Sequence, residues 1–223
     1  MFASLTSTAA GLWVALAAPV FGMFAVLRGY EARLGGPVCE TALLPRRQEM
    51  LVAATVSAAG LELVVLSANS LSEAIAAVGL FAPLTYLAVF DSRFLAVPVR
   101  TCLALACAGA LYWAATSGWT HALDAATSGG AAWCGFRLLD RLYIRVRGHS
   151  GLGAGDALVA ADIAVWTSPV DLAWAVAAGC GLTLAFAAVR GRGRRDALSE
   201  AWPLAPGLAA GAAIVFVAHR VLG

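Results

Sequence analysis

The sequence predicts an all-α, polytopic membrane protein with about eight transmembrane helices. Of its 223 residues, 61% are hydrophobic and 13% are charged, whereas a soluble domain has about 45–50% apolar and about 25% charged residues. The mean hydropathy is +0.82. Apolar stretches recur from one end of the chain to the other, which excludes a soluble domain with a single anchor. We therefore expect one integral membrane domain over residues 1–223.

Eight apolar segments have roughly the length needed to cross a bilayer, which is about 20 helical residues. They cover residues 11–27, 50–67, 71–90, 99–117, 122–142, 157–167, 172–189 and 203–220. The fifth is weakened by Arg137, Asp140 and Arg141, and the sixth is short and contains Asp162. We expect either of these two to be partial or tilted if neighbouring helices shield it from lipid.

The arginines predict the orientation of the chain. All 15 basic residues are arginine, and 14 of them follow the first, third, fifth or seventh segment or lie at its end, whereas only Arg220 falls on the other side. The positive-inside rule makes the arginine-rich side cytoplasmic and places both termini outside. Residues 1–27 carry no charge, so they indicate a first span rather than a secretory signal peptide with its basic start.

Carboxylates in or beside apolar segments are candidates for function because they are costly in a membrane. The acidic residues of this kind are Glu62, Glu73, Asp91, Asp124, Asp140, Asp156, Asp162 and Asp171. Glu73, Asp124 and Asp171 lie near outer helix ends, where solvated or capping roles fit. Asp140 is expected to pair with Arg137 or Arg141, and the roles of Glu62 and Asp162 stay open.

Asp91 and Asp156 differ from the other acids because both lie at the predicted cytoplasmic boundary, on different spans. Two facing carboxylates cannot easily both ionise, so such a pair shares a proton and supplies one general base and one general acid. That is the equipment of an aspartic peptidase. Gly151, Gly153 and Gly155 precede Asp156 and would let a substrate backbone approach closely. The competing interpretation is a flexible loop followed by a helix cap.

The stretch GLGAGD, residues 151–156, resembles the G-x-G-D motif of the type IV prepilin peptidases, a family of intramembrane aspartic peptidases. Asp91 precedes Pro98 by seven residues, as the first catalytic aspartate of that family precedes a proline, and Val97-Pro98 matches the pair that ends the segment. Residues 164–166 (AVW) and 202–211 (WPLAPGLAAG) are similar to later family elements. The resemblance covers residues 85–218, the expected peptidase core, and it implies that Asp91 and Asp156 are catalytic.

Three features depart from the family pattern. Leu158 stands where the family usually has a lysine, and Asp162 stands at an alanine-like position. A short cytoplasmic loop, residues 28–49, replaces the methyltransferase region and holds only Cys39 of the five cysteines. We therefore expect no metal, no cofactor and no methyltransferase activity. The other four cysteines lie in apolar segments, where packing as small hydrophobic residues is expected.

The resemblance implies an aspartic endopeptidase of the bacterial inner membrane that cleaves the basic leader from prepilin-like precursors at the cytoplasmic face, serving type IV pili or secretion. Its expected partners are that membrane-bound substrate and the lipid bilayer, without nucleic acid. Two alternatives stay open. One is a transporter with a carboxylate relay through Glu62, Asp156 and Asp162, although no internal repeat supports it. The other is a catalytically silent relative that binds pilin-like helices or scaffolds an assembly machine.

Overall fold

The computed structural model describes residues 70–190 and 203–222 as a bundle of α-helices, and this part of the chain contains no strand. The helices are α3 (Leu71–Phe94), α4 (Val99–Ser117), α5 (Trp119–Arg147), α6 (Ala154–Trp166), α7 (Pro169–Arg190) and α8 (Ala205–Leu222). The all-α prediction is confirmed for these residues. The expected spans at 11–27 and 50–67, Glu62 and the loop 28–49 with Cys39 lie outside the described residues.

Three of the described helices are long and apolar enough to cross a membrane: Leu71–Ser92, Val99–Ser117 and Pro169–Ala188. Ala205–His219 is a shorter apolar helix. α5 is not among the candidates: its second half carries four arginines and Asp140, and its first half carries His121 and Asp124. α6 has 13 residues and spans only about 20 Å at 1.5 Å per residue, against a hydrocarbon core of about 30 Å. The described part therefore supports a helical membrane protein but not eight complete spans.

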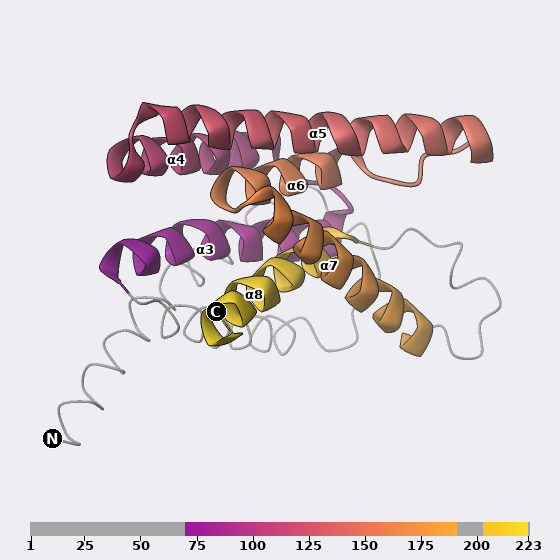
Figure 1. Ribbon diagram of the computed structural model, residues 1–223. Coiled ribbons are helices and arrows are strands. Elements are labelled where there is room, and N and C mark those ends of the chain that lie inside the picture. The colour runs from indigo at the N-terminus through magenta and orange to yellow at the C-terminus, as the bar shows by residue number, and fades with distance from the viewer. Residues whose placement is uncertain (1–69, 191–202, 223) are drawn as a thin grey trace, which may run out of the picture.

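α6 lies at the centre of the bundle and contacts all five other described helices. Figure 1 shows α4 and α5 running side by side along one side, with α6 next to α5, and α7 and α8 crossing on the opposite side. α3 packs against α4 and α8. Seven of the 13 residues of α6 are buried, as expected of a short apolar helix shielded from lipid by its neighbours.

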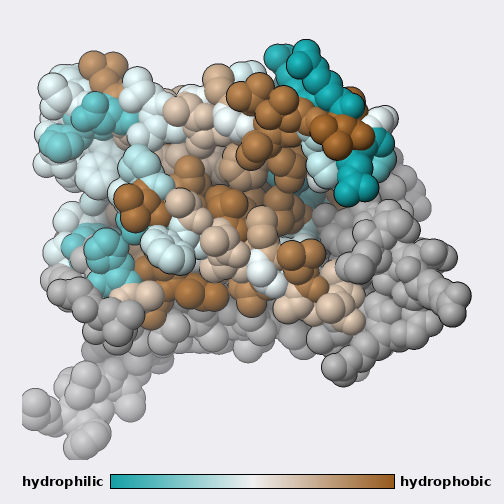
Figure 2. Space-filling view, turned by 45° about the vertical axis from the view of Figure 1, so that its right-hand side comes forward, coloured by the Kyte–Doolittle hydropathy of each residue, from teal (hydrophilic) through white to brown (hydrophobic). Residues whose placement is uncertain are grey.

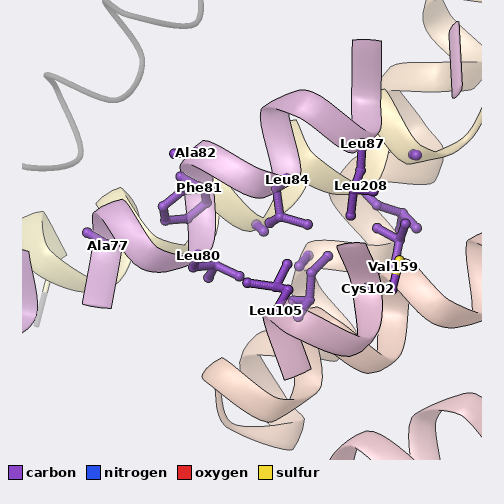
Figure 3. Packing of buried hydrophobic residues seen from close by; sticks show 14 residues of the cluster. Ala77, Leu80, Phe81, Ala82, Leu84, Leu87, Cys102, Leu105, Val159 and Leu208 are labelled. Carbon is purple, nitrogen blue, oxygen red and sulfur yellow. The ribbon is translucent and has the colours of Figure 1, made fainter. Parts of the chain in front are cut away.

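The apolar core gathers around α6 (Figure 3). Val159 and Ile163 of α6 are fully buried. They belong to one cluster with Leu84 and Leu87 of α3, Cys102 and Leu105 of α4, and Leu208 of α8. This cluster joins the first described helix to the last, so the N- and C-terminal halves of the described chain share one core.

Small residues let the other helices approach the C-terminal end of α6. A Cβ built on Gly109 of α4 would lie 2.7 Å from Nε1 of Trp166, and one on Gly79 of α3 would lie 2.9 Å from the same indole ring. The Trp166 indole N–H donates to the Leu105 carbonyl oxygen at 3.1 Å. Trp166 therefore fills a slot that exists only because both neighbouring helices carry glycine where they face it.

α7 and α8 approach each other even more closely, with their backbones in contact. A Cβ built on Gly179 of α7 would lie 2.7 Å from the Gly207 carbonyl oxygen of α8. Gly207 and Gly211 form a G-x-x-x-G pattern on α8, and Gly211 faces the Ala175 carbonyl. Such small-residue faces allow helices to pack tightly in membranes, where the hydrophobic effect does not drive association.

The surface of the described bundle is largely apolar. Figure 2 shows hydrophobic residues across the middle of one face, with hydrophilic residues towards its edges. Large hydrophobic side chains are exposed on several helices, among them Leu103 and Leu111 on α4, Trp174 and Leu184 on α7, and Ile214 on α8. Exposed apolar area on this scale fits a surface that contacts lipid.

Two adjacent glycines of α5 provide a matched test of this packing. A Cβ on Gly129 would lie 2.5 Å from Val165 Cγ2, whereas one on Gly130 would meet nothing within 4 Å. We expect Gly129→Leu to lower the free energy of unfolding by about 2 kcal/mol through overpacking. Gly130→Leu should be neutral or stabilise by up to about 1 kcal/mol through helix propensity. Unfolding of the two variants in detergent checks this, and equal effects would contradict the packing of α5 on α6.

Candidate active site

Asp91 lies in the last turn of α3 and is buried. Its Oδ2 accepts a hydrogen bond of 3.2 Å from the Ala205 backbone N–H, at the start of α8. Helix N-termini offer free N–H groups and a partial positive charge, which favour a carboxylate. The carboxylate of Asp91 is therefore held by a helix that begins 114 residues later in the chain.

The chain leaves α3 in a constrained conformation about one turn after Asp91. Leu95 ends the helix with φ 47°, and its N–H donates to the Asp91 carbonyl oxygen at 2.8 Å. A left-handed conformation costs a non-glycine residue about 1–2 kcal/mol. Val97 and Pro98 then lead into α4, with Pro98 at its N-cap. This strained link fixes the direction in which the chain leaves the Asp91 carboxylate.

Asp156 lies in the first turn of α6, where it takes part in capping the helix. Its Oδ2 accepts a hydrogen bond of 2.8 Å from the Gly153 N–H, and its own N–H donates to the Gly153 carbonyl oxygen at 3.1 Å. Gly153 is the N-cap and has no side chain, so one half of a capping box forms here, namely the hydrogen bond from the Gly153 N–H to the Asp156 carboxylate. The capping interpretation of the sequence is thus seen here, with Asp156 at the third helical position rather than at the cap itself.

The electrostatics of Asp156 reflect its surroundings. The pKa of Asp156 is raised above its usual value, chiefly by burial. The hydrogen bond from Gly153 lowers this pKa, and the charge of Asp140 raises it. Asp156 in turn acts electrostatically on Asp91 and on Cys180 of α7. The acids Asp91, Asp140 and Asp156, from α3, α5 and α6, therefore occupy the same end of the bundle.

The glycines before Asp156 allow other parts of the same chain to pack closely against this segment. A Cβ on Gly155 would lie 2.6 Å from Val97 Cγ2, and one on Gly151 would lie 2.6 Å from the Tyr143 ring. Neither Gly151, Gly153 nor Gly155 has a positive φ. The start of α6 thus packs directly on the link that follows Asp91, so the two aspartate segments are brought side by side.

The two carboxylates are not hydrogen-bonded to each other among the described contacts; each is held by a backbone N–H instead. The sequence identified both segments, but it gave no signal for the Ala205 N–H as a partner. That donor lies in a stretch, residues 202–211, which was singled out only by its resemblance to the last span of the family.

Asp140 is the third acid at this end, and it is buried on α5. Its expected partner Arg137 lies 3.9 Å away, from Nη1 to Oδ2. Its main partners, however, are in the loop before Asp156: Ser150, Gly151 and Leu152 all donate to Oδ1. Sequence reasoning missed these contacts because an acid near two arginines on one helix already has an obvious partner.

Asp162 lies almost two helical turns beyond Asp156 on α6, and its side chain is only 2% exposed. The Cys102 thiol of α4 donates to its carboxylate, while Oδ2 has no partner in the described part of the chain. Asp162 therefore faces the core between α4 and α6. Together with Asp156 it places two carboxylates on α6, but Glu62, the third member of the hypothetical relay, lies outside the described residues.

The acids near the predicted outer ends have local roles. The Glu73 N–H donates to Ser70 Oγ in the first turn of α3, and the Asp171 N–H donates to Ser168 Oγ in the first turn of α7. His219 of α8 lies 3.2 Å from Asp171 Oδ1. In both helices a serine side chain therefore caps the first turn, and the acid contributes its backbone N–H to that cap.

A cavity of about 470 Å³ opens at the C-terminal end of α6, away from Asp156. Trp113, Trp166 and Phe216 contribute to its apolar walls, and Asp124 and His219 to its polar lining. It is therefore separate from the end of the bundle where Asp91 and Asp156 lie.

One of three comparisons with known proteins gives a match. The family model of the type IV leader peptidases matches residues 78–189, a range that begins in α3, ends in α7 and includes Asp91 and Asp156. No curated protein and no solved structure matches the chain. The loop before Asp156 and the link after Asp91 both lie within the matched range.

The contact between Gly155 and Val97 can be tested by a double-mutant cycle. In the wild-type background, we expect Gly155→Ala to destabilise the protein by about 1–3 kcal/mol, because the new Cβ collides with a stiff β-branched side chain. In a Val97→Gly background the same change should be neutral or stabilise by about 1 kcal/mol, since alanine is the better helix former. Unfolding in detergent measures both effects, and an identical effect in the two backgrounds would show that the segments do not touch.

Proposed function

Since the chain belongs to the type IV leader peptidase family, we propose that it is an aspartic endopeptidase in which Asp91 and Asp156 form the catalytic pair. Membership of the family implies peptidase activity. We propose in addition that the mechanism is aspartic and that Asp91 and Asp156 carry it out. The observation that carries it is the packing of Gly155 on Val97, which sets the two aspartate segments side by side at one end of the bundle.

The chemistry needs one carboxylate and one carboxylic acid. The ionised aspartate takes a proton from a water molecule, whose oxygen then bonds to the scissile carbonyl carbon. The protonated aspartate donates its proton to the departing amide nitrogen as the C–N bond breaks, which leaves a carboxylic acid and an amine. Burial of Asp91 and partial burial of Asp156 favour a shared proton, because two nearby charges in a desolvated site repel each other.

The proposed substrate is a prepilin-like precursor with a basic leader and an apolar helix. The candidate pair lies at the end of the bundle where α5 carries Arg141, Arg145 and Arg147. The positive-inside rule makes this the cytoplasmic side, so a leader that stays in the cytoplasm would reach the pair while its helix remains in the bilayer. We therefore propose a site at the cytoplasmic face of the bacterial inner membrane, serving type IV pili or secretion.

A silent relative is the second candidate, and Leu158 favours it. Leu158 is partly buried against the core cluster, so the position two residues after Asp156, which usually carries a lysine in the family, contributes apolar packing here. Such a protein would bind pilin-like helices without cutting them. A cleavage assay separates the two functions directly.

We expect Asp91→Asn and Asp156→Asn each to lower the cleavage rate of a prepilin-like precursor by at least about 100-fold, because a positioned acid or base contributes about 10²–10⁴-fold. The double variant should be little worse than either single one, since the pair acts as a unit. The assay is precursor processing by purified protein in detergent.

Asp124→Asn is the matched control, because Asp124 is an exposed carboxylate at the opposite end of the bundle. It should process the precursor at the wild-type rate. Wild-type cleavage by Asp91→Asn or Asp156→Asn would refute the catalytic pair, and binding of the precursor without cleavage by the wild type would favour the silent relative.

A further inference from the structure

The burial of Asp140 is not explained by its position on α5. Its side chain is buried although the residues around it on this part of the helix, Leu139, Arg141 and Leu142, are exposed. A carboxylate removed from solvent costs free energy unless it receives hydrogen bonds. The hydrogen bonds that Asp140 receives therefore have to offset the cost of its burial.

A single oxygen of Asp140 receives three hydrogen bonds from consecutive residues of the loop between α5 and α6. Oδ1 accepts from Ser150 Oγ at 2.7 Å, from the Leu152 N–H at 3.1 Å and from the Gly151 N–H at 3.2 Å. Ser150 Oγ also lies 2.9 Å from the Leu152 carbonyl oxygen. Hydrogen bonds to an ionised acceptor are roughly twice as strong as those between neutral groups.

The loop held in this way leads directly to Asp156. The residue after Leu152 is Gly153, whose N–H donates to Asp156 Oδ2 at 2.8 Å. In Figure 1 this connection turns back along α5 before it enters α6. The end of α5 therefore determines, through three residues of loop, where the donor to Asp156 lies.

We propose that Asp140 is a positioning residue for Asp156: it clamps residues 150–152 to α5 and thereby fixes the N–H group that orients the Asp156 carboxylate. Asp140 touches neither the substrate nor the reacting atoms in this proposal. Its effect on cleavage rests on the proposed function, whereas the clamp itself is a property of the loop and can be measured without a substrate.

Amide hydrogen exchange of the full-length protein in detergent tests the clamp. In the wild type, the amides of Gly151 and Leu152 should be protected although they lie outside any helix. Asp140→Ala should raise their exchange rates at least about tenfold, because it removes the shared acceptor. Asp140→Asn keeps an oxygen acceptor and should retain part of the protection. Asp124→Ala, which removes an exposed carboxylate from the same helix, should change neither amide.

Cleavage of a prepilin-like precursor tests the positioning role. Asp140→Ala should lower kcat by about 10–100-fold, since small displacements of a catalytic group have effects of this size. KM should change by less than about threefold, because the substrate does not contact Asp140. Asp140→Asn should recover part of the lost kcat, and Ser150→Ala, which removes one of the three donors, should lie between Asp140→Asn and the wild type.

The exchange rates test the clamp, and the cleavage rates test the positioning role. Unchanged exchange at Gly151 and Leu152 in Asp140→Ala would overturn the clamp, and faster exchange with wild-type kcat would overturn its role in positioning. If Asp140→Ala does not fold, Asp140→Asn and Ser150→Ala provide the same comparison with smaller effects. If the wild type cleaves no precursor, the proposed function fails, while the exchange rates still confirm or overturn the clamp.

Discussion

The position of a short buried helix determines the rest of this structure. α6 has 13 residues, too few to cross a bilayer, yet it contacts every other described helix. A helix of this length in lipid would leave its terminal N–H and C=O groups without water or protein partners. The surrounding helices enclose most of α6. Glycines on α3, α4 and α5 make room for Trp166 and Val165 at the C-terminal end of α6. At its N-terminal end Gly153 and Ala154 are exposed, and there the half-buried Asp156 carboxylate accepts a hydrogen bond from the Gly153 N–H.

Backbone N–H groups at the starts of two helices hold the two candidate catalytic carboxylates. Gly153 caps α6 and donates to Asp156, and Ala205 begins α8 and donates to Asp91. Both donors favour an ionised carboxylate, which offsets part of the cost of removing the acids from water. The first N–H groups of a helix have no partner within the helix. Here two such N–H groups donate to the Asp156 and Asp91 carboxylates, so donors and acceptors satisfy each other.

Much of this architecture could be predicted from the sequence, and the failures have physical causes. The apolar segments predicted all six described helices, and the G-x-G-D stretch with Asp91 and Pro98 identified the segments that the structure brings together. The count of complete spans was not supported, because hydropathy does not distinguish a buried short helix such as α6 from one that crosses the membrane. The partners of Asp140 were missed because Arg137 satisfies the local pattern on α5, whereas the Ser150 hydroxyl and two loop amides become neighbours only when the loop turns back. Nothing in the sequence pairs Ala205 with Asp91, since this contact depends on how α8 packs.

The two carboxylates depend on different parts of the fold, and this follows from how each is held. The donor to Asp156 is three residues away in the chain, so its geometry is set locally by the loop and by Asp140. The donor to Asp91 is 114 residues away, and its position depends on the packing of α8 against α3 and α7. On α8 the small residues Gly207 and Gly211 allow contact with the backbone of α7, so a larger side chain there would displace the start of α8 together with the Ala205 N–H. The surroundings of Asp91 are therefore sensitive to the face between α7 and α8, while those of Asp156 are sensitive to the end of α5. Two hydrogen bonds thus hold these acids, one local and one between distant helices, and the packing of Gly155 on Val97 joins the two segments.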